Sequence, residues 1–185
     1  MGYYSPGMLD PAIQHLIAIA LAAIFAGSAA MKLYDLEAFE GAVANYRLLP
    51  RWSEKPAAWA IPIFESLCAA GILLPATRPV AARALVVLLG VLSGAVAINL
   101  GRGRRDIDCG CFGPMLRQKL GASLLARNLA LIIAALLLEL APVARGLAPI
   151  DYVTIAFGAA TLIVLYASAN YAIANAPRTR ALQAL

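Results

Sequence analysis

Charged residues are scarce in this chain: only 14% of its 185 residues are Asp, Glu, Lys or Arg, whereas soluble domains carry about 25%. The scarcity is not local, because long uncharged runs recur along the sequence. Hydrophobic residues make up 62% of the chain, with Ala and Leu the commonest. This composition excludes the water-soluble classes and indicates several membrane spans. The short alternating segments of a β-barrel are also missing, so we expect the spans to be helices.

A cleavable signal peptide is not expected, because the N-terminus lacks a basic region and its first apolar run is long enough to span a membrane. The net charge of +5 comes from basic residues in the loops, where lipid headgroups and topology explain them first. We therefore expect a lipid bilayer and no nucleic acid among the partners. The single histidine, His15, is expected to have no functional role.

Five apolar segments are long enough to cross roughly 30 Å of hydrocarbon at about 1.5 Å per helical residue. We predict an all-α polytopic membrane bundle that forms one domain over residues 1–185. Four core transmembrane helices and a fifth, C-terminal span are expected at about 12–31, 57–74, 80–100, 122–141 and 150–174. A short amphipathic helix at the membrane interface is expected after the first span. Apolar residues at helical spacing predict it: Leu36, Phe39, Val43, Tyr46 and Leu49.

Cysteine is rare as well, yet two of the three cysteines, Cys109 and Cys111, are one residue apart in the polar break before the fourth span. A Cys-x-Cys pair can close a small, strained disulfide that is easily reduced and exchanged. Nearby arginines would lower a thiol pKa, and nearby aspartates would oppose them. Metal ligation and a purely structural role are the alternatives, although a zinc site would need ligands from elsewhere. Cys68, inside an apolar segment, is expected to pack in the core, with a third redox thiol as the alternative.

Glu65 is the most unusual residue of the expected spans, because a carboxylate inside the bilayer is costly unless it is paired or protonated. We expect it to face the bundle interior, either as a proton acceptor or in an ion pair with Lys32 or Arg127. Those two cations can instead extend towards the interface. Three amides are expected to form hydrogen bonds between helices: Asn99, Asn128 and Asn170.

Taken together, these features resemble the MauE family of methylamine utilisation membrane proteins, which is related to the DoxX-like group. The resemblance covers about residues 12–138, and the run Asp-Cys-Gly-Cys-Phe-Gly is its most specific part. The other matching features follow in order: 27–32, Asp35 with Phe39, 46–50, Pro62 with Glu65, 99–103, 106–114, and Ser123 with Arg127 and Asn128.

The resemblance implies a role in maturing methylamine dehydrogenase, whose small subunit is rich in disulfides. It implies a partner like MauD, a thioredoxin-fold protein, and a redox-active pair formed by Cys109 and Cys111. No cofactor is required by this interpretation, and no metal is expected. Five residues are expected to support the site: Glu65, Arg127, Asn128, Lys32 and Asn99.

The chain is also similar to vitamin K epoxide reductase and its bacterial homologues, which pass electrons from thiols to a quinone. It departs from their pattern, because those enzymes use Cys-x-x-Cys and a second cysteine pair in the first connection. Here residues 32–55 contain no cysteine. A quinone-linked thiol oxidase is therefore one alternative function. The other is a non-catalytic membrane anchor or chaperone for the thioredoxin-like partner.

Two arguments about membrane orientation disagree. Lys and Arg are more numerous in the connections on the side of the cysteines, and the positive-inside rule would place that side in the cytoplasm. Disulfide chemistry needs an oxidising compartment. We predict a multi-pass protein of the bacterial inner membrane with the cysteine motif facing the periplasm, because the thiol motif constrains function more directly.

Overall fold

The computed structural model describes residues 8–110 and 118–183, with side chains up to residue 175. In chain order the elements are β1 (Met8–Leu9), α1 (Pro11–Tyr34), α2 (Leu36–Asn45), α3 (Arg51–Leu73), α4 (Arg78–Gly101), α5 (Ala122–Leu137), β2 (Ala141–Pro142) and α6 (Pro149–Gln183). The predicted all-α class is confirmed, because the only strands in the described part of the chain are two residues long.

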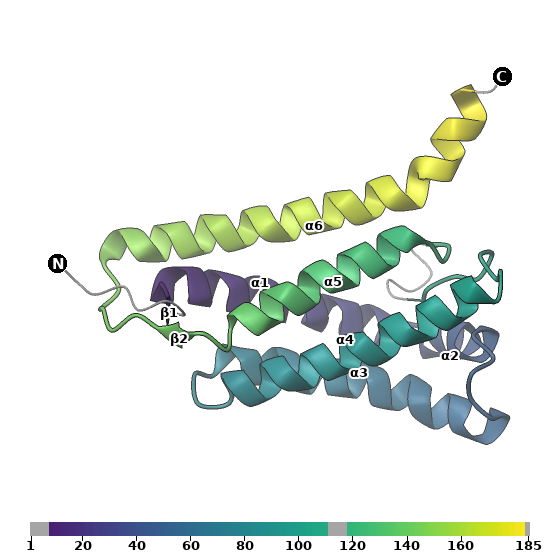
Figure 1. The fold of residues 1–185 in the computed structure, drawn as a ribbon, viewed down its shortest axis with the longest axis horizontal. Coiled ribbons are helices and arrows are strands. Elements are labelled where there is room, and N and C mark those ends of the chain that lie inside the picture. Colours follow the sequence, from purple (N-terminus) through teal and green to yellow (C-terminus); the bar gives the residue numbers. More distant parts are fainter. Residues whose placement is uncertain (1–7, 111–117, 184–185) are drawn as a thin grey trace.

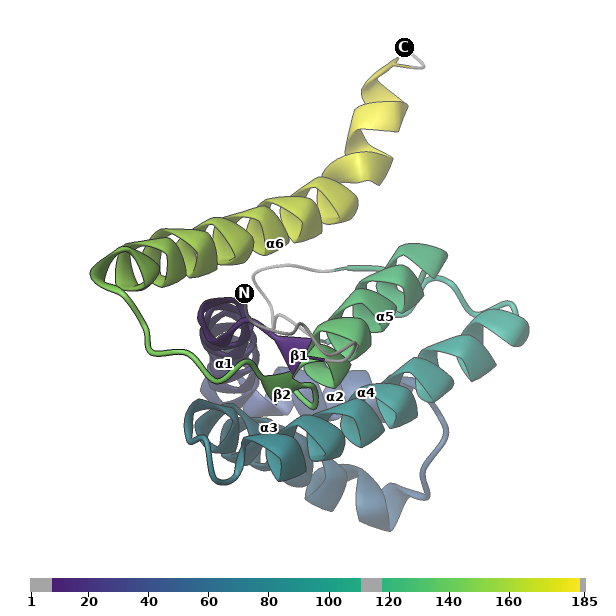
Figure 2. The same ribbon diagram turned by 60° about the vertical axis from the view of Figure 1, so that its left-hand side comes forward.

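Four helices run alongside one another as a bundle, α1, α3, α4 and α5 (Figure 1). Helix α2 lies across the end of the bundle at which α1 finishes and α3 begins. Helix α6 packs along α1, and its C-terminal turns bend away from the other helices (Figure 2). The short helix predicted after the first span is thus present as α2.

The prediction of a multi-pass membrane protein is confirmed by helix length and composition. In the described residues, four helical segments are long and apolar enough to cross a membrane: Pro11–Tyr34, Arg51–Leu73, Arg78–Gly101 and Pro149–Asn175. They extend the expected spans at one or both ends. For α3 the earlier start follows Pro50, whose extended backbone (φ −68°, ψ 148°) forms the N-cap of the helix.

Helix α5 is shorter than the expected span 122–141. It has 16 residues, about 24 Å at the usual rise, and ends at Leu137. The backbone N–H groups of residues 138–140 bond three residues back rather than four, which tightens the final turn. The chain then forms β2, which pairs in parallel with β1. The pairing partner lies more than 130 residues away in sequence, so no local pattern could have indicated this end.

Small side chains bring the bundle helices close together. The main hydrophobic cluster includes several alanines of α1, α3 and α4, with Leu85 and Ile72 completely buried. At Gly71 the helices α3 and α4 approach closely, because an added Cβ there would lie 2.9 Å from the Cβ of Ala81. Lipid provides no hydrophobic driving force between helices, so association depends on the close van der Waals packing that small residues allow.

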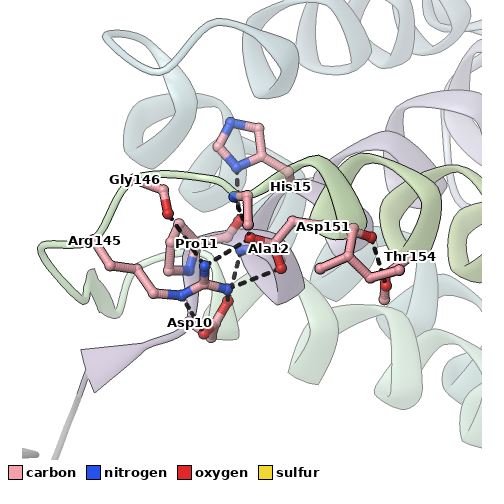
Figure 3. A network of polar contacts seen from close by, with 10 residues as sticks. Asp10, Pro11, Ala12, His15, Arg145, Gly146, Asp151 and Thr154 are labelled. Atoms are coloured by element: carbon pink, nitrogen blue, oxygen red, sulfur yellow. Dashed lines mark hydrogen bonds and ion pairs between the residues drawn. The ribbon is translucent and has the colours of Figure 1, made fainter.

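A polar network ties the first and last spans together (Figure 3), at the end of the bundle opposite α2 (Figure 1). Asp10 is the N-cap of α1, and its side chain accepts a hydrogen bond from the N–H of Ala12 at 2.8 Å. Arg145 donates to both carboxylate oxygens of Asp10, at 2.8 and 2.7 Å. The same guanidinium contacts Asp151, in the first turn of α6, at 2.7 Å. One side chain therefore joins α1 to α6.

A second, buried polar group at this end involves Gln14 and Arg78, which are 6% and 5% exposed. Arg78 donates to the side-chain oxygen of Gln14 at 3.1 Å and to the carbonyl of Ile72 at 3.0 Å. Gln14 in turn donates to the carbonyls of Leu138 and Leu140. Two side chains thus bind the backbone ends of α3 and α5, which have no partner within their own helices.

Candidate functional site

The cysteine motif follows α4 and is held by a short antiparallel pairing of its flanks. The N–H of Cys109 donates to the carbonyl of Gln118 at 2.8 Å, and the N–H of Leu120 donates to the carbonyl of Ile107 at 3.1 Å. These bonds bring residues 107–109 beside 118–120, and Cys109 is 7% exposed. Cys111, its predicted redox partner, lies outside the described residues. The position of Cys109 is therefore fixed by backbone bonds from both sides of the connection.

Gly110, between the two cysteines, has a backbone that other residues adopt at a cost. Its φ is +71°, in the left-handed region that favours glycine. An added Cβ would lie 2.8 Å from the Cβ of Ala42 and 3.3 Å from the ring of Phe39, both in α2. The turn and α2 are therefore in direct contact, and this contact leaves no room for a side chain at position 110.

The segment after α2 also contacts the cysteine turn. The hydroxyl of Tyr46 lies 3.5 Å from the carbonyl oxygen of Cys109, to which it can donate. Arg104 donates to the carbonyl of Tyr46 at 3.3 Å and to the side-chain oxygen of Asn99 at 3.1 Å. Asn99, one of the expected supporting residues, is fully buried at the end of α4 and also donates to the carbonyl of Ala95. It supports the turn indirectly, through Arg104.

Lys32 and Glu65 form a buried ion pair between α1 and α3. The ammonium nitrogen of Lys32 is 2.6 Å from both carboxylate oxygens of Glu65 and 2.8 Å from the hydroxyl of Ser28. The two side chains are 3% and 2% exposed. Of the partners considered for Glu65, Lys32 is in direct contact with it, and this lysine does not extend towards the interface. The ammonium also lies over the ring of Phe39, 5.5 Å from the ring centroid, which adds a cation–π contact.

Arg127 and Asn128, near the start of α5, form a second polar group between helices. Arg127 donates twice to the side-chain oxygen of Asn128 and once to that of Asn170, at 3.2 Å. Asn128 donates to the hydroxyl of Ser93 at 3.0 Å. These bonds connect α4, α5 and α6, which agrees with the interhelical role expected for both asparagines.

The bundle brings most of the expected site residues to one cavity of about 390 Å³. Its walls are largely apolar and come from every helix, with Cys109 at one wall. Four of the supporting residues also line it, namely Lys32, Glu65, Arg127 and Asn128. Residues as far apart in sequence as Lys32 and Asn128 thus line one cavity beside Cys109. Its volume is in the range of cavities that bind small ligands.

Two of the expected residues lie elsewhere. Asn99 does not line the cavity. Cys68 is 3% exposed and packs in the main hydrophobic cluster, whereas Cys109 belongs to a separate cluster with Val96, Leu120 and Leu124. Cys68 forms no disulfide with a described residue. Its position favours the packing interpretation over a third redox thiol.

Several contacts of the site were not indicated by the sequence. Gln118 holds Cys109 through its backbone carbonyl, which carries no residue-specific signal. Tyr166 of α6 lines the cavity, although the even hydrophobicity of that span gave no reason to select it. The sequence marked Phe39 as an apolar residue of the amphipathic helix but did not indicate its contacts with Lys32 and Gly110. Within residues 8–110 and 118–183, no group of three or more His, Cys, Asp or Glu side chains could hold a metal ion.

The fold and the site define a class of protein: a polytopic α-helical membrane protein in which a cysteine-bearing turn closes on a cavity between the helices. Residues 10–141 match the family model described as methylamine utilisation protein MauE. That match covers most of the chain and all of the site described here except the contacts of α6. The chain belongs to the MauE family.

Curated relatives agree with this assignment. A methylamine utilization protein MauE from Paracoccus versutus is 40% identical over 162 residues, which are 87% of each chain. The protein of the same name from Methylorubrum extorquens is 39% identical over 85% of each chain. That from Paracoccus denitrificans is 35% identical over 88% of each. No solved structure matches the chain.

Proposed function

We propose that this chain is a membrane thiol–disulfide exchange protein that assists disulfide formation or isomerisation during maturation of the methylamine dehydrogenase small subunit. The observation that carries the proposal is the placement of Cys109. It stands on a turn fixed from both sides, next to a left-handed glycine and at the wall of a cavity with buried charges. The relatives' name supplies the link to methylamine utilisation.

The exchange needs Cys111 as the second sulfur and a thioredoxin-fold partner like MauD. A thiolate of the partner attacks one sulfur of the Cys109–Cys111 disulfide, and the other sulfur leaves as a thiolate. The second thiolate of the partner then attacks the mixed disulfide. The partner ends as a disulfide and this chain as a dithiol, so two electrons move and no other reactant is consumed. The same steps run in reverse where the partner is to be reduced.

Trapping of the mixed disulfide tests this proposal. Single changes Cys109→Ser and Cys111→Ser each remove one sulfur, so the remaining thiol is expected to accumulate in a stable bond with the partner. Cys68→Ser is the matched control, because Cys68 packs in another cluster and its loss should leave exchange unchanged. If neither single change alters the complex or the redox state of the partner, the exchange role is excluded. A complex that survives loss of both cysteines, with the dehydrogenase matured normally, would instead establish an anchor or chaperone.

The cavity favours a second candidate function, a quinone-linked thiol oxidase. Its volume of about 390 Å³ accommodates one substituted ring, and its largely apolar walls lie among the membrane-spanning helices next to Cys109. In that reaction the dithiol becomes a disulfide and a quinone takes up two electrons and two protons. Reduction of ubiquinone by the reduced, purified protein in lipid nanodiscs would support it. Equal rates for the original chain and Cys109→Ser would exclude it.

A further inference from the structure

Phe39 links the buried ion pair to the cysteine turn. Within α2 it is the one buried residue, at 5% exposure. One part of its ring faces the ammonium of Lys32, 5.5 Å from the ring centroid. Another part borders Gly110, where an added Cβ would be 3.3 and 3.4 Å from two ring carbons. The same ring therefore has the ion pair on one side and the backbone of the cysteine motif on another.

The ion pair fixes the position of this ring. Lys32 is near the end of α1 and directs its three N–H donors to Glu65 and Ser28, so its ammonium has a defined place between α1 and α3. A cation over an aromatic face is attracted most strongly where water is excluded. The contact with Lys32 thus holds the ring, and α2 with it, in position against α1 and α3.

We infer that Phe39, held by the Lys32–Glu65 pair, is a positioning residue that sets the placement of the Cys109–Gly110 turn against the bundle. Its biological meaning rests on the proposed exchange role of Cys109, but the contact can be tested without it. The close approach of Gly110 to α2 passes any shift of Phe39 to the neighbouring Cys109. Loss of the ring is therefore expected to loosen this turn while the main hydrophobic cluster stays closed.

Cysteine labelling of the full-length chain tests this inference, in a Cys111→Ser background that retains Cys68 and Cys109. Both thiols are buried, at 3% and 7% exposure, so each reports the opening of its own region. Phe39→Ala is expected to accelerate labelling of Cys109 by a neutral thiol reagent roughly tenfold or more, through local opening. Labelling of Cys68 should change less than about twofold, because the main cluster is intact.

Three further variants separate positioning from general stability. Glu65→Gln should accelerate labelling of Cys109 in the same direction as Phe39→Ala, because Lys32 loses the charge that holds it. Phe39→Tyr keeps the ring and should restore slow labelling. Ile72→Ala, in the main cluster, should lower the melting temperature without selective labelling of Cys109. The inference is overturned if Phe39→Ala and Glu65→Gln leave labelling of Cys109 unchanged, or if Phe39→Ala accelerates labelling of both cysteines equally, as Ile72→Ala would on partial unfolding. None of these outcomes depends on the partner or on disulfide exchange.

Discussion

Gly110 is restricted both by its left-handed backbone and by its close contact with α2, whereas Gly103 is restricted only by its backbone. Both have a left-handed backbone, with φ of +71° and +73°. Around Gly103 no atom of the described residues, other than its own chain neighbours, lies within 4 Å of an added Cβ, whereas at Gly110 the Cβ of Ala42 would be 2.8 Å away. The pair therefore allows backbone strain to be measured separately from the contact with α2.

Gly103→Ala is expected to lower the free energy of unfolding by about 1–2 kcal/mol, the cost of the left-handed region for a residue with a Cβ. Gly110→Ala should cost roughly 2–4 kcal/mol, since overpacking against Ala42 adds to the same strain. Denaturant unfolding in detergent micelles measures both. Equal losses for the two variants would show that α2 yields without cost and that the contact is loose.

The buried ion pair of Lys32 and Glu65 makes the stability of the fold depend on single charged residues. Glu65→Gln leaves the ammonium of Lys32 in an apolar surrounding without its counter-charge, and we expect a loss of about 3–5 kcal/mol. Replacing both partners, as Lys32→Met with Glu65→Leu, removes the desolvation cost together with the attraction and should recover most of that loss. The same unfolding measurement compares the two. A double variant as unstable as Glu65→Gln would contradict this account.

Among the elements, α1 and α6 depend on each other through Arg145. The hydrogen bond from Arg145 lowers the pKa of Asp10 below its usual value of 3.8. A carboxyl whose pKa is lower in the folded state stabilises the fold above its ordinary pKa, and this contribution disappears as pH falls through the lowered value. The clamp between the two helices should therefore weaken only in acid, below about pH 4.

Arg145→Gln is expected to lower the melting temperature at pH 7. Between pH 5 and pH 3 the melting temperature of this variant should fall less than that of the original chain. Lys119→Gln is the matched control, because the partner Asp106 also has a lowered pKa but both side chains are largely exposed. Exposed pairs contribute little to stability, so this control should change the melting temperature much less. An identical acid profile for Arg145→Gln and the original chain would rule out the clamp.

The sequence predicted the elements well where one physical limit determines them. Bilayer thickness sets the length of a span, so hydropathy placed the ends of the four long apolar segments to within six residues. It failed at α5, whose end depends on Gln14 and on pairing with β1. The partner of Glu65 was left open for a similar reason. The choice between Lys32 and Arg127 depends on how each helix is rotated, which spacing along the chain does not determine.

At the scale of the whole molecule, the cysteine turn and the Arg145 clamp lie at opposite ends of the bundle. The turn follows α4 and precedes α5, and the clamp joins the starts of α1 and α6. Labels at the two ends therefore report the orientation of the whole protein. This arrangement allows the disagreement between loop charges and thiol chemistry to be decided directly.

Arg105→Cys and Ala76→Cys, in a chain otherwise free of cysteine, place a thiol at an exposed position at either end. With the cysteine motif in the periplasm, an impermeant thiol reagent should label Arg105→Cys in intact spheroplasts. It should label Ala76→Cys only after permeabilisation. The reverse pattern would place the motif in the cytoplasm and contradict a periplasmic exchange role.

The clamp also sets an order of events during biosynthesis. Asp10 is made early, whereas Arg145 and Asp151 leave the ribosome only after five helices have been made. The N-terminus of α1 therefore lacks its charged partner until the last helix begins to enter the membrane. The clamp therefore forms only once α6 has begun, and a copy truncated before Arg145 leaves Asp10 without this partner.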